Sequence, residues 1–367
     1  MNPLIFILFL FAAAAALDKF FGNRLKLGEE FDKGLALMGP LSLSMVGLYC
    51  FSTLAGQKLA DLFGERAGWF LDPSVLVGCV LSSDIGAYAV SEQIAATPEI
   101  AAFSGLLLAS VLGSTLSFAL PATIGSVRRE DTEPLLTGTA YGILTIPIGL
   151  VPGGLLAGLS ARTLLSCLLP VLLFSLALAC GIRFRRSAAV RAVGLLGRGM
   201  QALSILLFLL TAVGIFWELP ALADPSRVSE ILLIILRVTV VICGSLAAVS
   251  VLLRLAKKPI LRLSQLLGVN EYAVAGLLMT TVTSLAMAAV FERMDRRGKV
   301  FNAAFAVSGA FVFGGQLAFV SAAREAIIPA YVLSKLIGGI TAGILALCLC
   351  PRTDPSRCAA VLQENQS

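Results

Sequence analysis

Histidine is absent from this chain of 367 residues, and charged residues make up only 14% of it. Without histidine, metal sites built on imidazole, Ser–His–Asp triads and histidine proton relays are excluded. The low charge accompanies 58% hydrophobic residues and a mean hydropathy of +0.92, far above the value for a soluble domain. The composition therefore predicts a polytopic membrane protein whose surroundings are the lipid bilayer.

Lysine and arginine are also missing before the first apolar run, although the alanines at 12–16 resemble the end of a signal peptide. The positive charges follow the run instead, at Lys19, Arg24 and Lys26. A signal peptide has the opposite order, with its charges first. We therefore expect a retained first helix whose amino terminus lies outside the cell.

Nucleotide-binding and hydrolase motifs are lacking as well: no Walker motif, dinucleotide fingerprint, nucleophile elbow or metal-ligand spacing occurs. The eight cysteines lie mostly inside apolar segments at unrelated spacings, which is typical of small buried side chains. We expect no enzyme activity, no cofactor, no metal and no ATP drive. The net charge of +6 lies in short loops, so membrane orientation explains it better than a nucleic-acid partner.

Eleven apolar runs are present, and most reach the roughly 20 residues needed to cross a bilayer. If all eleven crossed, lysine and arginine would be divided almost evenly between the two sides, against the enrichment expected in cytoplasmic loops. If the third run of each half instead returns to the side it came from, the division becomes 21 to 5. The runs lie near residues 3–18, 34–56, 73–91, 100–125, 135–160, 163–182, 199–218, 228–253, 272–291, 300–322 and 330–350.

An internal repeat supports two related halves. Residues 72–121 resemble the stretch 198 positions later without a gap, so that Gly78 falls on Gly276 and Ser104 on Asn302. Such a period is far longer than a solenoid unit and is typical of a duplicated transporter half. The alternative is a chance similarity between two membrane segments.

The predicted fold is therefore an all-α polytopic membrane protein made of two inverted five-segment repeats joined by a linking helix. The third segment of each repeat is re-entrant, which leaves nine crossings among the eleven segments. The two re-entrant hairpins would then meet near the midplane, where inverted-repeat transporters bind substrate. The alternative is that both segments span. The parts are the first repeat at 1–160, a linking helix and basic cytoplasmic loop at 161–199, the second repeat at 200–350, and a polar cytoplasmic tail at 351–367.

Asp84, in the middle of the first re-entrant segment, is the strongest functional signal. A carboxylate at that depth costs about 2.5–3.5 kcal/mol to insert, so it has a partner or a function. Three roles are open: a structural carboxylate held by hydroxyls and amides, a proton-coupling group, or a direct partner for a cationic substrate. Gly86 follows at the position where the tip of a hairpin requires a turn.

The predicted substrate-binding group combines this carboxylate with hydroxyl and amide side chains of both repeats, which can hydrogen-bond a small polar solute. Hydroxyls inside membranes also cap broken helices and bond across helix pairs, so each one is open to a structural role. The candidates are Asp84, Ser82, Ser83, Thr280, Thr283, Ser284, Gln316 and Asn302.

A second predicted group serves gating or helix breaking and contains Gly86, Pro147, Gly149 and Lys335. We expect the stretch around Pro147 and Gly149 to break its helix in mid-membrane, either along a pathway or as a packing kink. Lys335 lies near the start of the last run. The simpler interpretation is that it snorkels to the membrane surface, and the alternative is that it competes with a substrate amine for Asp84.

Several blocks of sequence, in the same order, resemble the ethanolamine utilization transport family EutH. They include residues 31–34, 82–86, 145–149, 294–300 and 335–339. The resemblance implies a permease of the bacterial inner membrane that lets ethanolamine enter the cell, by facilitated diffusion or alternating access. Ethanolamine is a small ammonium with one hydroxyl, which a carboxylate flanked by serine and threonine would complement. The carboxyl terminus would then be cytoplasmic.

Two departures from the family pattern fall on polar positions. Thr283 and Ser284 stand where a pair of asparagines is expected, and Gly315 and Gln316 where an acidic residue and a histidine are expected. A cation-coupled carrier of another small amine or metabolite is therefore one alternative. The other is a non-transport membrane component of ethanolamine utilization. The oligomeric state is left open.

Overall fold

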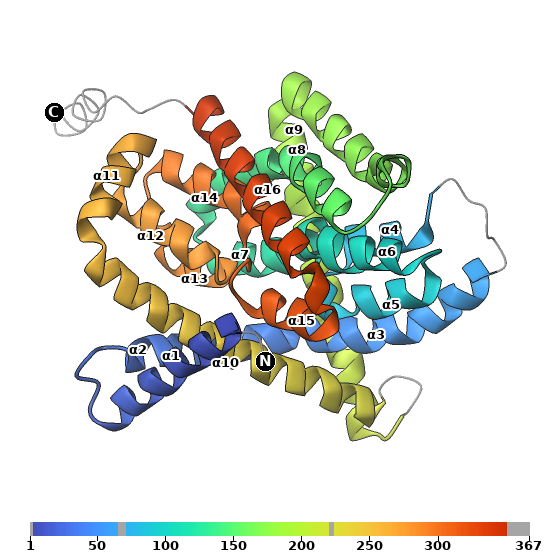
Figure 1. The fold of residues 1–367 in the computed structure, drawn as a ribbon, viewed down its shortest axis with the longest axis horizontal. Coiled ribbons are helices and arrows are strands. Elements are labelled where there is room, and N and C mark those ends of the chain that lie inside the picture. The colour runs from blue at the N-terminus through green and yellow to red at the C-terminus, as the bar shows by residue number, and fades with distance from the viewer. Residues whose placement is uncertain (1–2, 65–70, 220–223, 351–367) are drawn as a thin grey trace.

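The computed structural model of the protein describes residues 3–64, 71–219 and 224–350, and within these ranges every regular element is a helix (Figure 1). The all-α class is thus confirmed for this part, whereas the predicted tail at 351–367 lies outside the described residues. In order, the elements are α1 (Pro3–Phe20), α2 (Gly28–Ala36), α3 (Met38–Gly64), α4 (Pro73–Val80), η1 (Ser83–Ile85), α5 (Ala87–Ile94), α6 (Pro98–Ala102), η2 (Phe103–Gly113), η3 (Thr115–Ala119), α7 (Leu120–Ser126), η4 (Arg129–Asp131), α8 (Thr132–Leu156), α9 (Ala161–Phe216), α10 (Pro225–Leu255), α11 (Lys257–Leu267), α12 (Glu271–Thr280), α13 (Ser284–Phe291), α14 (Arg296–Gly309), α15 (Gly315–Ala323), η5 (Glu325–Ile327) and α16 (Ile328–Leu349).

Seven helical stretches in the described part are long and apolar enough to cross a membrane, so the chain is a multi-pass membrane protein. Helices such as α4 and α5, with eight residues each, are only about 12 Å long and cannot cross singly. The seven stretches are Gly28–Phe51, Pro98–Ser126, Arg129–Leu156, Ala161–Arg185, Ser187–Phe216, Pro225–Leu255 and Glu325–Leu349.

Helix α9 contains two of these stretches, and they join at Arg185, whose φ of −145° and ψ of 66° are not helical. The basic loop predicted within 161–199 is therefore wrong, because the chain is helical on both sides of this single residue. The stretch 186–198 consists mainly of alanine, valine, leucine and arginine and has no proline, so little in it opposes a helix.

Two pairs of short helices, α4 with α5 and α12 with α13, form hairpins whose ends are tied together (Figure 1). Asp72 caps α4, and its Oδ2 also accepts from the amide of Ala96 beyond α5 at 2.9 Å. Asn270, 198 positions after Asp72, caps α12 and donates to the carbonyl of Arg293 beyond α13 at 2.8 Å. Gly86 makes the turn of the first hairpin, between α4 and α5, with a φ of 104°, which only glycine adopts without strain.

The helix that follows each hairpin is attached to it by equivalent contacts. Ser104 Oγ bonds to the carbonyl four residues earlier at 2.7 Å and to Ser74 Oγ of α4 at 2.8 Å. Asn302 Nδ2 donates to the carbonyl four residues earlier at 3.0 Å and to the Ala273 carbonyl of α12 at 2.9 Å. The contacts therefore recur at the 198-residue spacing of the sequence repeat.

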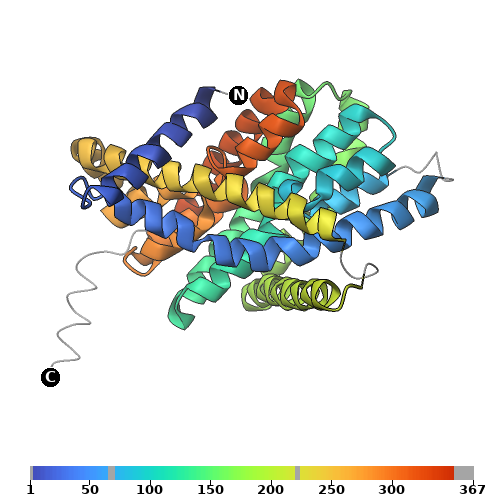
Figure 2. The same cartoon turned by 90° about the horizontal axis from the view of Figure 1, so that it is seen from below.

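Close contacts between the outer helices recur at a similar spacing. A Cβ added to Gly47 of α3 would lie 2.3 Å from the Phe208 nitrogen of α9. A Cβ added to Gly244 of α10, 197 positions later, would lie 1.8 Å from the Leu8 carbonyl oxygen of α1. The second half of α9 thus packs on α3 as α1 packs on α10, and Figure 2 shows α3 and α10 lying next to each other.

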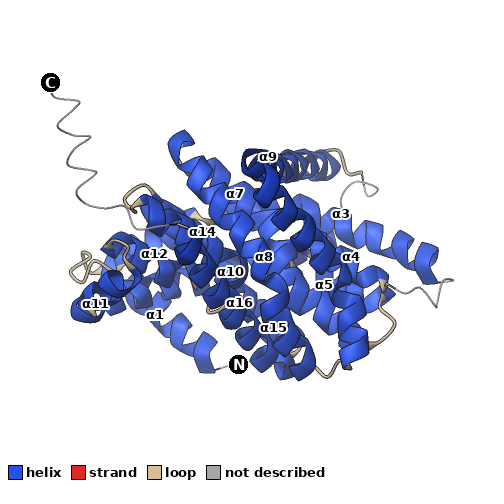
Figure 3. Ribbon diagram, turned by 90° about the horizontal axis from the view of Figure 1, so that it is seen from above, coloured by secondary structure: helices blue, strands red, loops and turns tan. Residues whose placement is uncertain are grey.

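Helices α8, α14 and α16 pack against one another at the centre of the molecule (Figure 3). Their approach depends on glycine. A Cβ on Gly149 of α8 would lie 2.4 Å from the Ser334 carbonyl oxygen and 2.8 Å from Gly338 Cα, both in α16. Small residues at such a contact let two backbones come close, which drives helix association where lipid removes the hydrophobic effect.

The predicted helix break at Pro147 and Gly149 is wrong, because α8 runs through both residues. Proline lacks the N–H that would bond to the carbonyl of residue 143, one turn earlier. Ser175 of α9 supplies the missing donor: its Oγ bonds to the Ile143 carbonyl at 3.0 Å. The neighbouring helix therefore satisfies the carbonyl that proline frees, and the helix need not open.

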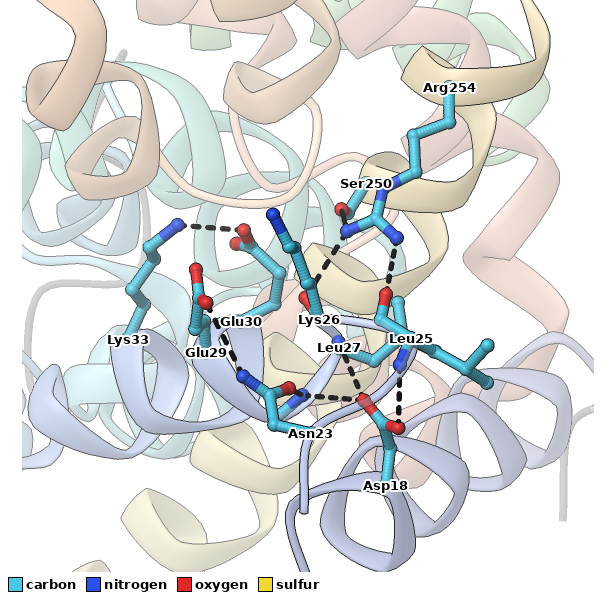
Figure 4. Close-up of polar contacts among 11 residues, drawn as sticks. Asp18, Asn23, Leu25, Lys26, Leu27, Glu29, Glu30, Lys33, Ser250 and Arg254 are labelled. Carbon is cyan, nitrogen blue, oxygen red and sulfur yellow. Dashed lines mark hydrogen bonds and ion pairs between the residues drawn. The ribbon is translucent and has the colours of Figure 1, made fainter. Parts of the chain in front are cut away.

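The turn between α1 and α2 is fixed by one aspartate and one arginine (Figure 4). Asp18 accepts from the amides of Leu25 and Leu27, each at 2.9 Å. Arg254, at the end of α10, donates to the carbonyls of Leu25 and Lys26. The Arg254 bonds join this turn to the end of α10.

Substituting Gly149→Ala should lower the free energy of unfolding by about 1–3 kcal/mol, because the new methyl group overlaps the α16 backbone. Gly199→Ala is the control, since a Cβ there has no neighbour within 4 Å. Thermal unfolding of both variants in the same detergent compares them. Equal midpoints would show that α8 and α16 do not depend on this contact.

Candidate functional site

Four charged side chains are buried in the described part of the chain: Asp18, Asp84, Asp131 and Lys335. Asp18 accepts hydrogen bonds from backbone amides, and Asp131 pairs with Lys299. That leaves one carboxylate and one ammonium without a nearer partner of opposite charge. Burying either of them alone is costly, so their surroundings define the candidate site.

Asp84 lies in η1, at the tip of the first hairpin, and Ser82 Oγ donates to its Oδ1 at 2.5 Å. The Ser82 amide in turn donates to Ser117 Oγ at 3.1 Å. The hairpin tip is therefore attached to the helix that follows it. The left-handed turn at Gly86 allows the chain to reverse directly after the carboxylate.

Gln316 connects this tip to the second half of the chain. Its Nε2 lies 3.2 Å from Ser82 Oγ and 2.7 Å from Ser114 Oγ, both in the first half. Its Oε1 accepts from Lys335 Nζ at 3.1 Å. The Gln316 side chain thus connects the Lys335 ammonium to the Ser82 hydroxyl, which binds Asp84. Gln316 and Ser82 are 234 residues apart in the sequence.

Lys335 does not snorkel, so the simpler interpretation of the sequence is wrong. Its side chain is 1% exposed, and Nζ donates to the Ser110 carbonyl at 2.6 Å as well as to Gln316. The ammonium also lies over the ring of Tyr331, 5.2 Å from its centroid. The reason is the position of α16: this face packs into the protein, where acceptors are nearer than the membrane surface.

An irregular segment between α14 and α15 positions Gln316 on the first turn of α15. Within it, Phe311 has a φ of 64°, and its amide donates to the Thr280 carbonyl at 3.2 Å. The Phe313 amide likewise donates to the Thr281 carbonyl at 2.9 Å. The second hairpin therefore supplies hydrogen-bond acceptors for the amides of this irregular segment. Backbone polar groups inside a membrane need such partners.

Four of the predicted residues, Asp84, Ser82, Gln316 and Lys335, come together, and we refer to them as the Asp84–Lys335 cluster. Tyr331 belongs with them but was missed by sequence reasoning. The signal was available, because Tyr331 and Lys335 are four residues apart and share one face of a helix. Its hydroxyl donates to the Phe311 carbonyl at 2.9 Å, which fixes the ring.

The remaining candidates have other surroundings. Thr280 Oγ1 donates to a carbonyl of its own helix at 2.7 Å, and Thr283 caps α13. Asn302 holds α12, as described above. Ser284 lines a small cavity of about 20 Å³, enough for a single water. Ser83 is buried beside Asp84, and its hydroxyl has no hydrogen-bond partner in the described residues.

A larger open cavity of about 610 Å³ lies between α1, α10 and α15, away from the cluster. Arg237, Ser321 and Glu325 line it, together with Ala318 and apolar residues. Helix α15 thus presents Ala318 to this cavity while its first turn carries Gln316 into the cluster. One short helix separates the open space from the buried charges.

The cluster is suited to binding an ammonium ion. Carbonyl and amide oxygens accept its N–H groups, an aromatic ring faces its positive charge, and a carboxylate balances that charge. No group of three or more Cys, Asp or Glu side chains within the described ranges has the arrangement of a metal site.

Comparison with known proteins finds relatives that are named as permeases of a small amine, the kind of ligand that this cluster suits. The family described as "Ethanolamine utilisation protein, EutH" matches residues 1–349. The chain is 32% identical to "Probable ethanolamine permease EutH" of Listeria monocytogenes over 340 residues, covering 92% of this chain and 91% of the relative. It is 32% identical to the protein of the same name from Salmonella typhimurium, covering 90% and 87% of the two chains. It is 30% identical to the uncharacterized protein YxeR of Bacillus subtilis, covering 95% of each. No solved structure matches the chain significantly.

Replacing Gln316 by alanine should destabilise the protein by roughly 3 kcal/mol, because the variant leaves a buried ammonium and two serine hydroxyls short of a partner. Gln93→Ala, on the exposed face of α5, should change the stability by less than about 0.5 kcal/mol. Thermal unfolding midpoints measure the difference. A Gln316 variant as stable as the Gln93 variant would mean that the cluster is not a connected network.

Proposed function

The chain belongs to the EutH family of ethanolamine utilisation proteins, and on this premise we propose that it is a permease that admits ethanolamine to the cell. It acts as a transporter rather than as an enzyme. Seven helices able to span a membrane and relatives named as ethanolamine permeases support this function.

The observation that carries the proposal is the Asp84–Lys335 cluster. Ethanolamine offers an ammonium at one end and a hydroxyl at the other. The cluster offers a carboxylate and the Ser110 carbonyl for the first, and the buried serine hydroxyls beside them for the second. Asp84 balances the charge of the ammonium, and the hydroxyls of Ser82 and Ser83, which lie next to it in the chain, are the partners offered to the substrate hydroxyl.

Of the two departures from the family pattern, only one touches the cluster. Thr283 caps a helix, and Ser284 faces a cavity of about 20 Å³. Gln316 stands where a histidine was expected, and it contacts both Ser82 and Lys335. Because an amide also donates and accepts, this substitution keeps the relay between the two halves.

The architecture we propose consists of two inverted repeats, each with a re-entrant hairpin, and nine crossings. The hydrogen bonds that join residue 72 to 96 and residue 270 to 293 support this, because they place the two ends of each hairpin together. The contacts that recur 198 positions apart support the duplication. Asp84 then lies where the hairpins approach each other within the membrane.

We place the protein in the bacterial inner membrane, with its amino terminus outside and its carboxyl terminus in the cytoplasm. The distribution of lysine and arginine supports this orientation. Helix α11 carries Lys257, Lys258 and Arg262 and lies next to the inner end of α10. The cavity of about 610 Å³, which both Arg237 and Glu325 line, then opens outward and serves as the entrance for the substrate.

Saturable uptake of labelled ethanolamine tests the function. Cells should take up ethanolamine at limiting concentration and acidic pH, where the neutral amine is too scarce to diffuse across the membrane. Asp84→Asn should lower this uptake by roughly a hundredfold, because truncating one partner of a buried charge pair costs about 2–5 kcal/mol. Glu92→Gln, an exposed carboxylate of the same hairpin, should leave uptake intact. Loss of the whole protein without loss of uptake would refute the permease, and undiminished uptake by Asp84→Asn would make Asp84 structural.

Thiol labelling tests the hairpins. In a background without native cysteines, Leu71→Cys and Ala96→Cys should both react with a membrane-impermeant reagent from outside the cell. Tyr272→Cys and Arg293→Cys should both react only from the cytoplasmic side. If the two members of either pair are labelled from opposite faces, that hairpin crosses the membrane and the re-entrant architecture fails.

A further inference from the structure

We propose that Lys335 is a tethered substitute for the substrate: its ammonium fills the ammonium subsite when no ethanolamine is bound, and the substrate's ammonium displaces it. This inference rests on the permease function and adds the identity of the ammonium subsite and the reason that the unloaded carrier can return. The subsite consists of the Ser110 carbonyl, Gln316 Oε1 and the face of Tyr331.

The surroundings of Lys335 Nζ are those that a free primary ammonium would need. A carbonyl at 2.6 Å and an amide oxygen at 3.1 Å accept two of its three N–H groups. The Tyr331 ring, 5.2 Å away, faces the positive charge. A lysine that served only to anchor a helix would extend to the membrane surface, whereas this side chain is 1% exposed.

Charge balance explains why such a substitute is needed. Asp84 is buried, and Lys335 is the only cationic side chain buried in the described ranges. Without a cation, the carboxylate would be uncompensated inside the membrane each time the empty carrier returned, at a cost of several kcal/mol. Lys335 neutralises it through Gln316 and Ser82.

The duplication argues against a purely structural pair. At the 198-residue spacing, Asp84 corresponds to Val282 and Lys335 to Thr137. Each repeat thus carries one of the two charges, and the equivalent position in the other repeat is uncharged. The shared fold therefore does not require either charge, which leaves the site as the reason for both.

Displacement also predicts selectivity. A primary ammonium reproduces both hydrogen bonds of Lys335, whereas a quaternary ammonium has no N–H and leaves the Ser110 and Gln316 oxygens unpaired. The subsite therefore favours ethanolamine and other primary amines over their trimethylated analogues.

Two fluxes measured in proteoliposomes containing purified protein test the inference. Net uptake of labelled ethanolamine into empty vesicles requires the unloaded carrier to return, whereas counterflow into vesicles preloaded with unlabelled ethanolamine does not. In Lys335→Ala, the ratio of net uptake to counterflow should fall by roughly a hundredfold, because only the unloaded carrier lacks a cation for Asp84. Lys258→Ala, an exposed lysine of α11, is the matched control and should keep the wild-type ratio.

Each outcome decides one claim. If wild-type protein shows neither flux, the permease function fails. If the wild type shows both fluxes and Lys335→Ala lowers them equally, or leaves the ratio unchanged, Lys335 is not a substitute for the substrate and the inference fails alone.

If Lys335→Ala transports nothing, a binding measurement tests the inference instead. Truncating the side chain leaves space beside the Ser110 carbonyl that methylammonium fits. Methylammonium chloride should raise the unfolding temperature of the variant more than that of the wild type, and tetramethylammonium chloride should not. Equal shifts for the two proteins, or for the two salts, would overturn the inference.

Discussion

A buried carboxylate and a buried ammonium, joined through one hydroxyl and one amide, are the interaction on which the rest of the structure depends. Asp84 and Lys335 lie in different halves of the chain, and Ser82 and Gln316 connect them. Neither charge is stable alone at this depth, so the two halves are held in register by the need to neutralise each other.

The irregular backbone around the cluster follows from the same constraint. The chain turns at Gly86 and again leaves the helical conformation between α14 and α15, so its polar groups must find partners inside the protein. The amides of Phe311 and Phe313 bond to the end of α12, and the Ser82 amide bonds to Ser117. Each hairpin is thus bonded to the segment that follows it in its own half of the chain.

Helix α15 lies between the Asp84–Lys335 cluster and the open cavity, with Gln316 in the cluster and Ala318 at the cavity. That helix is nine residues long and is bounded by Gly314 and Arg324, whose backbones are not helical.

Sequence reasoning identified the membrane class, the all-helical fold and the family, because these depend on composition, hydropathy and local blocks of sequence. The 198-residue repeat and the role of Asp84 stay predictions. It failed where the answer depends on a neighbour far along the chain. Pro147 does not break α8, because Ser175 takes the freed carbonyl. Lys335 does not snorkel, because Ser110, 225 positions earlier, offers it an acceptor.

The sequence by itself therefore determined that this is a helical membrane protein of the EutH family with a carboxylate, Asp84, in the middle of an apolar segment. Only the tertiary structure decided which of the many buried hydroxyls and amides converge on that carboxylate. The physical reason is that serine, threonine, asparagine and glutamine can all cap a helix, bond within it or bind a ligand. Their roles are set by which donors and acceptors the packing brings within about 3 Å.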